Sequence, residues 1–265
     1  MDHAPLAFDR AGPSGDLPVV LVHAGIADRR MWDPQWAGLT ASRDAVRVDL
    51  RGFGESTTRP DGAMSHVDDV LATLDSLGIA RCHLVGASLG SGVVAELSLA
   101  RPELAASLLL APPGGSLLVE LTPDLRDFID AENEALERED LHAAVEANVS
   151  AWVVGPSRQA SDVPAELLDR VRVMQRRAFE IQEPWGDVAE AEPDPPVHDR
   201  LSSITAPALV LLGGHDLETT NDAAHRVGNG IPGAERVDWP DVAHLPSLER
   251  PDEFLALLLD WVDRA

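Results

Sequence analysis

The stretch CHLVGASLGSG, residues 82–92, decides the fold of this chain. It contains a short apolar run typical of a buried strand, then Gly86-Ala87-Ser88-Leu89-Gly90, then residues that open a helix. The five central residues match G-x-S-x-G, in which a sharp turn between a strand and a helix lifts a strained serine clear of the sheet. The stretch therefore predicts that Ser88 is a nucleophile.

The residues around Ser88 fit that interpretation. Gly86 and Gly90 lack a Cβ, so the strand and the helix can approach closely. The N–H of Leu89 is placed to bind a developing oxyanion. The alternative is that Ser88 merely caps a helix in a glycine-rich connection. The strand before it and the helix after it favour the catalytic interpretation.

Composition narrows the class of protein. The chain has 265 residues, of which 45% are hydrophobic, enough for one large α/β domain. The first five residues lack the features of a signal peptide, and no apolar run is long enough to cross a bilayer. Cys82, the single cysteine, is expected to be a small core residue. These features predict a cytoplasmic protein.

The net charge is −24, and all 21 basic residues are arginine. Nucleic acid and anionic membranes would repel such a chain, so we expect neither as a partner. The sequence contains no H-E-x-x-H, C-x-x-C or P-loop motif, so no metal and no cofactor are expected. The sequence leaves a homodimer open.

Apolar segments and helical segments alternate along most of the chain. Strands are expected at residues 4–10, 18–22, 45–50, 83–85, 107–111, 208–212 and 234–239, and helices at 31–39, 66–77, 91–100, 220–227 and 251–261. This alternation predicts an α/β fold with a mostly parallel central sheet flanked by helices. Ligands then bind outside the carboxyl ends of the strands.

Residues 116–200 differ from the rest, because they carry helical signals at 127–138, 140–152 and 164–182 and no strong strand signal. We expect them to form a helical cap, or lid, inserted between core strands. Residues 1–115 and 201–265 would form the core. The alternative is that these helices simply pack on the core.

Two further residues complete a catalytic triad with Ser88. Asp216 follows an apolar strand, and His244 lies in a loop after the last strand, where we expect it to be exposed. The chain order Ser, Asp, His is the one found in hydrolases that use G-x-S-x-G. His244 would move the serine proton, and Asp216 would orient the imidazole. Each could instead be an ordinary loop residue, but their joint placement at strand ends favours the triad.

The loop after the strand at 18–22 is expected to supply a second oxyanion donor, from the N–H of Gly25 or, failing that, of Ile26. His23 is expected to brace this loop. Asp49 and Arg51 are expected to pair and fix the neighbouring loop. The substrate pocket is expected to include a further set of side chains: Ile26, Leu245 and Trp152.

These motifs together resemble the α/β-hydrolase fold superfamily from residue 19 nearly to the carboxyl terminus. The elbow at 86–90, DLRGFGES at 49–56, GHD at 214–216 and AH at 243–244 carry the resemblance. Within the superfamily, HAG at 23–25 with MWDPQ at 31–35, and HLP at 244–246 with ERP at 249–251, look like 3-oxoadipate enol-lactonases and small carboxylesterases.

The resemblance implies a cofactor-free serine hydrolase that cleaves a small-molecule carboxylic ester or lactone through an acyl-enzyme intermediate. The same triad also supports thioesterases, perhydrolases, C–C bond hydrolases and biosynthetic cyclases. A different class is a non-catalytic sensor that binds a small ligand on this scaffold. An intact triad argues against the sensor.

Overall fold

The computed structural model describes residues 6–191 and 193–265. Within these residues, seven strands form one sheet in the order β1-β3-β2-β4-β5-β6-β7. The strands are β1 (Phe8–Ala11), β2 (Val19–Val22), β3 (Ala45–Val48), β4 (Cys82–Ser88), β5 (Ala105–Pro113), β6 (Ala208–Gly213) and β7 (Glu235–Trp239). β1 is antiparallel to β3, and the other pairings are parallel. The expected mostly parallel α/β fold is confirmed. Residues 1–5, which include the start of the expected first strand and the signal-peptide region, lie outside the described residues.

Helices follow most of the strands. They are α1 (Asp33–Thr40), α2 (His66–Ser76), α3 (Leu89–Ala100), α4 (Pro123–Glu137), α5 (Leu141–Asn148), α6 (Ala165–Gln182), α7 (Glu218–Gly230), α8 (Pro246–Glu249) and α9 (Pro251–Arg264). A π-helical segment, Val149–Val154, continues α5. None of the helices in the described chain has the length and apolar character that crossing a bilayer requires.

The central strands are buried on both faces, which explains their continuous apolar sequences. In β2, Val20 and Val22 belong to the cluster that α2, α3 and α7 cover, whereas Val19 and Leu21 belong to the cluster under α1 and α9. Side chains of a strand alternate between faces, so one short apolar run contributes to both layers. The sheet is thereby packed between two layers of helices, which support a site at the carboxyl ends of its strands.

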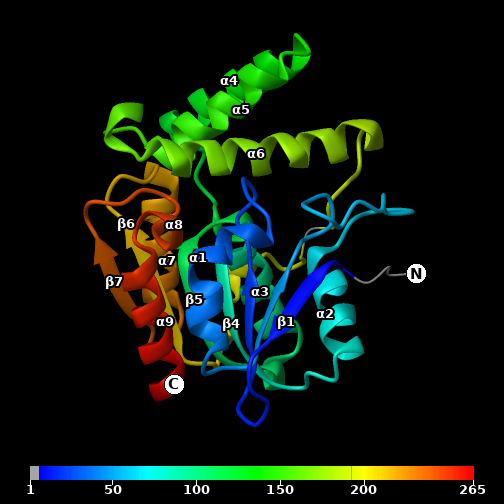
Figure 1. Cartoon of the computed structure of the whole chain (residues 1–265), viewed down its shortest axis with the longest axis vertical. Helices are drawn as coiled ribbons and strands as arrows, with labels where there is room; N and C mark the ends of the chain where they lie inside the picture. The colour runs from blue at the N-terminus through cyan, green and yellow to red at the C-terminus, as the bar shows by residue number, and fades with distance from the viewer. Residues whose placement is uncertain (1–5, 192) are drawn as a thin grey trace.

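Helices α4, α5 and α6 lie between β5 and β6 in sequence and extend across one end of the sheet in Figure 1. Their apolar residues Val145, Leu168 and Val171 join the same buried cluster as α1 and α9. The segment is therefore anchored to the core by apolar burial, which is the dominant favourable contribution to such packing.

His66, the first residue of α2, is buried in a way that should make stability depend on pH. The residue is 4% exposed, and its Nδ1 has no hydrogen-bond partner among the described residues. Burial lowers the pKa of His66 to about 4, with smaller effects from His23, Asp69 and Arg51. The neutral ring is therefore favoured in the folded protein, while the unfolded chain takes up a proton near pH 6.5.

We expect this difference to cost about 3 kcal/mol of the free energy of unfolding as the pH falls from about 6.5 to about 4. A His66→Leu variant should lose that part of the pH dependence, as measured by urea denaturation at several pH values. His142→Leu, on an exposed position of α5, is the matched control and should keep it. Identical pH slopes for wild type and His66→Leu would contradict the prediction.

Candidate active site

Ser88 occupies the turn between β4 and α3. Its backbone angles are φ 52° and ψ −115°, a conformation that non-glycine residues rarely adopt. Gly86 and Gly90 are required for this turn: a Cβ at residue 86 would lie 2.6 Å from the Ser91 nitrogen, and one at 90 would lie 2.7 Å from the His23 carbonyl oxygen. Such a strained serine supported by close backbone packing is typical of a functional turn.

Gly90→Ala is expected to destabilise the protein by about 1–3 kcal/mol, because the added methyl group would overlap backbone carbonyls that cannot move independently. The same substitution at Gly228 in α7 meets open space and should be neutral or stabilising by about 0.5–1 kcal/mol. Thermal or urea unfolding of the two variants measures both effects. A Gly90→Ala variant as stable as Gly228→Ala would show that the elbow tolerates a side chain.

Asp216 and His244 meet beyond the carboxyl ends of β6 and β7. The Nδ1 of His244 donates a hydrogen bond to Oδ2 of Asp216 over 2.7 Å, and the other Asp216 oxygen accepts from the Leu217 N–H over 2.8 Å. Both side chains are buried. The bond occupies Nδ1, which leaves Nε2 as the imidazole nitrogen available to a nucleophile.

The expectation that His244 is exposed was wrong, because the residue is only 2% exposed. The Trp152 ring from the inserted segment lies 4.4 Å from the His244 ring, centre to centre, and the His244 N–H donates to the Trp152 carbonyl over 3.3 Å. A loop can look exposed in sequence when a distant segment covers it.

Ser88 and His244 line one cavity of about 300 Å³. Residues from the core form its floor, and residues from α4, α5 with its π-helical extension, and α6 form its roof. The floor contains Ser88, His244, Gly25, Ile26 and Phe53; the roof contains Phe128, Glu132, Asn148, Trp152, Gln175, Ala178, Phe179 and Gln182. Of the three expected pocket residues, Ile26 and Trp152 line this cavity.

Leu245 differs from the expectation, because it is fully buried in the core cluster and is not among the residues lining the cavity. It immediately precedes α8, a short helix that the sequence did not indicate. The turn into α8 leaves His244 at the cavity and Leu245 packed in the core.

The expected oxyanion donors lie next to each other. A Cβ built on Gly25 would be in ordinary contact, 3.7 Å, with the Leu89 side chain. Leu89 is the first residue of α3, where backbone N–H groups have no partner within the helix. Gly25 and Ile26 both line the cavity, so the backbone of this loop borders the space above Ser88.

The loops around the site are fixed by polar contacts, one of which was predicted incorrectly. Asp49 and Arg51 do not pair: Arg51 forms a buried ion pair with Asp69, and Asp49 accepts hydrogen bonds from the N–H groups of Arg29 and Glu55 and pairs with the Arg29 guanidinium. Both residues follow the end of β3 at Val48, in a loop that brings Arg51 to Asp69 and Asp49 to Arg29, so nearness in sequence does not decide the pairing.

His23 braces the loop after β2, as expected. Its Nδ1 donates to the Ala24 carbonyl over 2.8 Å, and its Nε2 accepts from the Leu50 N–H over 2.9 Å. Burial lowers the pKa of His23, consistent with a neutral ring that uses one nitrogen as donor and the other as acceptor.

A brace for the His244 loop was missed from sequence. Arg158 pairs with Glu249 over 2.6 Å, and Glu249 accepts a 2.6 Å hydrogen bond from the N–H of Ala243, next to His244. The Arg158 guanidinium also donates to the carbonyls of Val153 and Val154. The ion pair therefore connects the inserted segment to the loop that holds the histidine, and an isolated Arg and Glu 91 positions apart give no sequence signal for it.

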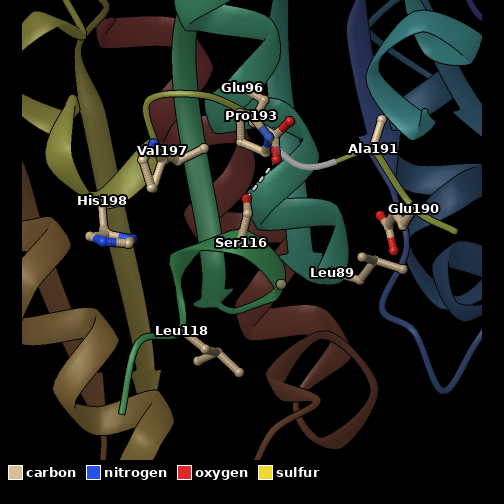
Figure 2. A pocket seen from close by; sticks show the side chains of 11 residues that line it. Leu89, Glu96, Ser116, Leu118, Glu190, Ala191, Pro193, Val197 and His198 are labelled. Atoms are coloured by element: carbon tan, nitrogen blue, oxygen red, sulfur yellow. Dashed lines mark hydrogen bonds between the residues drawn. The ribbon is translucent and has the colours of Figure 1, made fainter. Parts of the chain in front are cut away.

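A second, larger hollow of about 420 Å³ lies beside Leu89 and is shown in Figure 2. Its described lining includes Glu96, Ser116, Glu190 and His198. The Ser116 hydroxyl donates to Glu96 over 2.6 Å, drawn as a dashed line in Figure 2, and burial raises the pKa of Glu96. No member of the Ser88, Asp216 and His244 set is among its described lining residues, so the smaller cavity is the candidate active site.

The fold and the serine elbow define a class. Residues 19–257 match the model of the alpha/beta hydrolase family, and the chain belongs to that family. The resemblance inferred from the motifs is therefore confirmed.

Named relatives match nearly the whole chain. The chain is 25% identical over 252 residues to 3-oxoadipate enol-lactonase 1 of Acinetobacter baylyi, covering 95% of this chain and 90% of that protein. It is 29% identical to the strigolactone esterase RMS3 of Pisum sativum, covering 91% of each. Among solved structures, Est816, described as an N-acyl homoserine lactone degrading enzyme, superposes with a TM-score of 0.75 at 27% identity over 96% of both chains. These three proteins are named for ester or lactone cleavage, whereas several other relatives are named as putative carbamate hydrolases.

Proposed function

We propose that this protein is a cofactor-free serine hydrolase that cleaves a small-molecule carboxylic ester or lactone through an acyl-enzyme intermediate. The observation that carries the proposal is the buried 2.7 Å bond between His244 and Asp216 beside a cavity that His244 shares with Ser88. Membership of the alpha/beta hydrolase family, with relatives named as a lactonase and an esterase, supports the same reaction class.

In the proposed mechanism, Ser88 Oγ attacks the carbonyl carbon while Nε2 of His244 takes the hydroxyl proton. The Leu89 N–H and the Gly25 N–H, or that of Ile26, stabilise the negative charge that develops on the carbonyl oxygen. His244 then gives its proton to the leaving alkoxide as the C–O bond breaks, which leaves Ser88 acylated. Water, deprotonated by His244, releases the acid and restores the serine.

The inserted helices of residues 116–200 act in this proposal as a lid over the cavity. Trp152 contacts the His244 ring, and Phe128 packs edge-on against Trp152 with ring centres 5.3 Å apart. These aromatic groups exclude water from one side of the histidine, and electrostatic interactions are stronger in such a site than in water.

The experiment that tests the proposal is labelling with a fluorophosphonate, read by mass spectrometry, together with a panel of esters, lactones and thioesters. We expect stoichiometric modification of the peptide that contains Ser88, with loss of turnover in proportion. Full labelling of a different residue, or unchanged turnover after complete labelling at Ser88, would contradict the proposed mechanism. Turnover of thioesters alone would show that the substrate is a thioester and not the proposed ester or lactone.

A further inference from the structure

The roof of the active-site cavity carries four polar side chains that the triad does not use. They project from three helical segments: Glu132 lies one turn after Phe128 in α4, Asn148 ends α5, and Gln175 and Gln182 lie seven residues apart on α6. Residues at these spacings share one face of a helix. The face that contacts the cavity is therefore mixed apolar and polar.

Three of these side chains, Asn148, Glu132 and Gln182, have hydrogen-bond partners within the protein. The Asn148 amide donates to Glu132 Oε1 over 2.5 Å and to the Ala144 carbonyl over 3.0 Å, so both of its N–H groups are used. Gln182 donates to the Gly52 carbonyl over 3.1 Å and thereby ties α6 to the loop after β3. These contacts hold the roof in place and position Glu132.

Gln175 is different, because its amide makes no side-chain hydrogen bond within the described chain. The residue is 5% exposed, and its Oε1 is buried without a partner. Several buried side-chain atoms of the described residues lack a partner. Among them, Gln175 Oε1 is the one whose residue also lines the Ser88 cavity. Leaving a buried amide oxygen without a partner is costly, so a ligand in the cavity that meets this amide after rotation of the Gln175 side chain would supply a hydrogen bond that the protein does not.

The charged groups that line the cavity also bear on which substrates it can bind. Its described lining contains one carboxyl group, Glu132, and no arginine, and the sequence has no lysine. A carboxylate at Glu132 would repel an anionic substituent, and the described lining has no arginine or lysine to compensate. Burial raises the pKa of Glu132, as expected for a carboxyl group facing a poorly hydrated space.

We infer that Gln175 and Glu132 form a polar subsite that binds an uncharged hydrogen-bonding group of the substrate, an amide or a hydroxyl, and disfavours substrates with a second carboxylate. The inference rests on the proposed function and specifies the substrate class of the same site. An amide or hydroxyl suits both residues, because it can donate to the Glu132 carboxyl and exchange hydrogen bonds with the Gln175 amide. A carboxylate has no proton to donate and adds a charge.

Three γ-butyrolactones with side chains of equal length test the inference. The first lactone carries an acylamino group at the α-carbon, and the second carries an alkyl group of the same length there. In the third, a carboxylate stands where the first has its amide. In wild type, kcat/KM should be about tenfold higher for the acylamino lactone than for the alkyl lactone, and lowest for the carboxylate.

Two substitutions separate the roles of the residues. Gln175→Met keeps the side-chain length and should lower the ratio of kcat/KM between acylamino and alkyl lactone about tenfold. It should also raise the unfolding temperature, since an unpartnered buried amide is replaced by an apolar group. Glu132→Gln keeps an acceptor for Asn148 and should raise kcat/KM for the carboxylate lactone relative to the alkyl lactone by about tenfold.

Matched controls lie on the outer faces of the same helices. Glu134→Gln makes the same charge change as Glu132→Gln at an exposed position of α4, and Glu180→Met places a methionine at an exposed position of α6. Neither should alter the substrate ratios. A wild-type enzyme that hydrolyses the three lactones with equal kcat/KM would overturn the inference without any variant. Failure of wild type to hydrolyse any ester or lactone would instead overturn the proposed function.

Discussion

Replacing Ser88 with alanine is expected to lower kcat about 10⁴- to 10⁶-fold on every ester or lactone that the wild-type protein hydrolyses. The variant loses the atom that forms the acyl-enzyme, whereas the elbow, the cavity and the His244–Asp216 pair remain. The residual rate would come from the oxyanion donors and from binding alone. KM should change little, because the hydroxyl contributes mainly in the transition state.

Initial rates and protein stability should be measured together for this variant. Ser150→Ala is a suitable control, because Ser150 is exposed in the π-helical segment that also carries Trp152. It should retain the wild-type kcat. A Ser88→Ala variant that is folded and within tenfold of wild type would rule out Ser88 as the nucleophile.

Asp216→Asn is expected to lower kcat about 10⁴-fold with little change in stability. The carboxylate accepts the Nδ1 proton of His244 over 2.7 Å and the Leu217 N–H over 2.8 Å, so it fixes both the orientation and the tautomer of the imidazole. An amide at this position can present its NH₂ group to Nδ1, and this would place the imidazole proton on Nε2, where a base is needed. The loss should appear in kcat rather than in KM.

Asp241→Asn provides the comparison, because Asp241 lies in the same loop as His244 but is exposed and paired with Arg250 over 2.8 Å. That variant should keep near-wild-type kcat. Equal kcat values for the Asp216 and Asp241 variants would show that Asp216 does not orient the base.

The parts of the fold that sequence predicted well are those set by local patterning. Each expected strand corresponds to a strand of the sheet within the described residues. In the central strands, burial on both faces demands a run such as Val19–Val22 with no polar interruption. The elbow was equally predictable from sequence. A Cβ at residue 86 or 90 would overlap the neighbouring backbone, so both positions require glycine. Gly78, just after the end of α2, has φ 69°, the left-handed conformation that favours glycine there.

The parts that sequence did not predict depend on contacts between distant segments. Arg51 pairs with Asp69 instead of Asp49, and Arg158 joins Glu249 across 91 positions. An ion pair has no periodicity, and many carboxylates compete for each arginine in a chain with 45 acidic residues. Only the positions of the folded backbone decide which partner lies within reach.

The roof of the cavity illustrates the same limit. Gln175 lies beside Met174 in a helix that the sequence predicted, but apolar spacing cannot tell a polar residue packed against the core from one that faces the cavity of Ser88. The rotation of α6 about its own axis places Gln175, Phe179 and Gln182 over Ser88. That rotation is set by how Leu168 and Val171 pack on the cluster beneath.

Sequence by itself determined the layered sheet, the strained turn at residue 88 and the order of the residues proposed as a triad, because these follow from local backbone geometry and from the alternation of apolar and polar positions. Tertiary structure alone decided that Trp152 covers His244, that Leu245 enters the core and that Gln175 and Glu132 border the cavity. The physical reason is that these features depend on the packing of the inserted helices against the core, which no short-range pattern encodes.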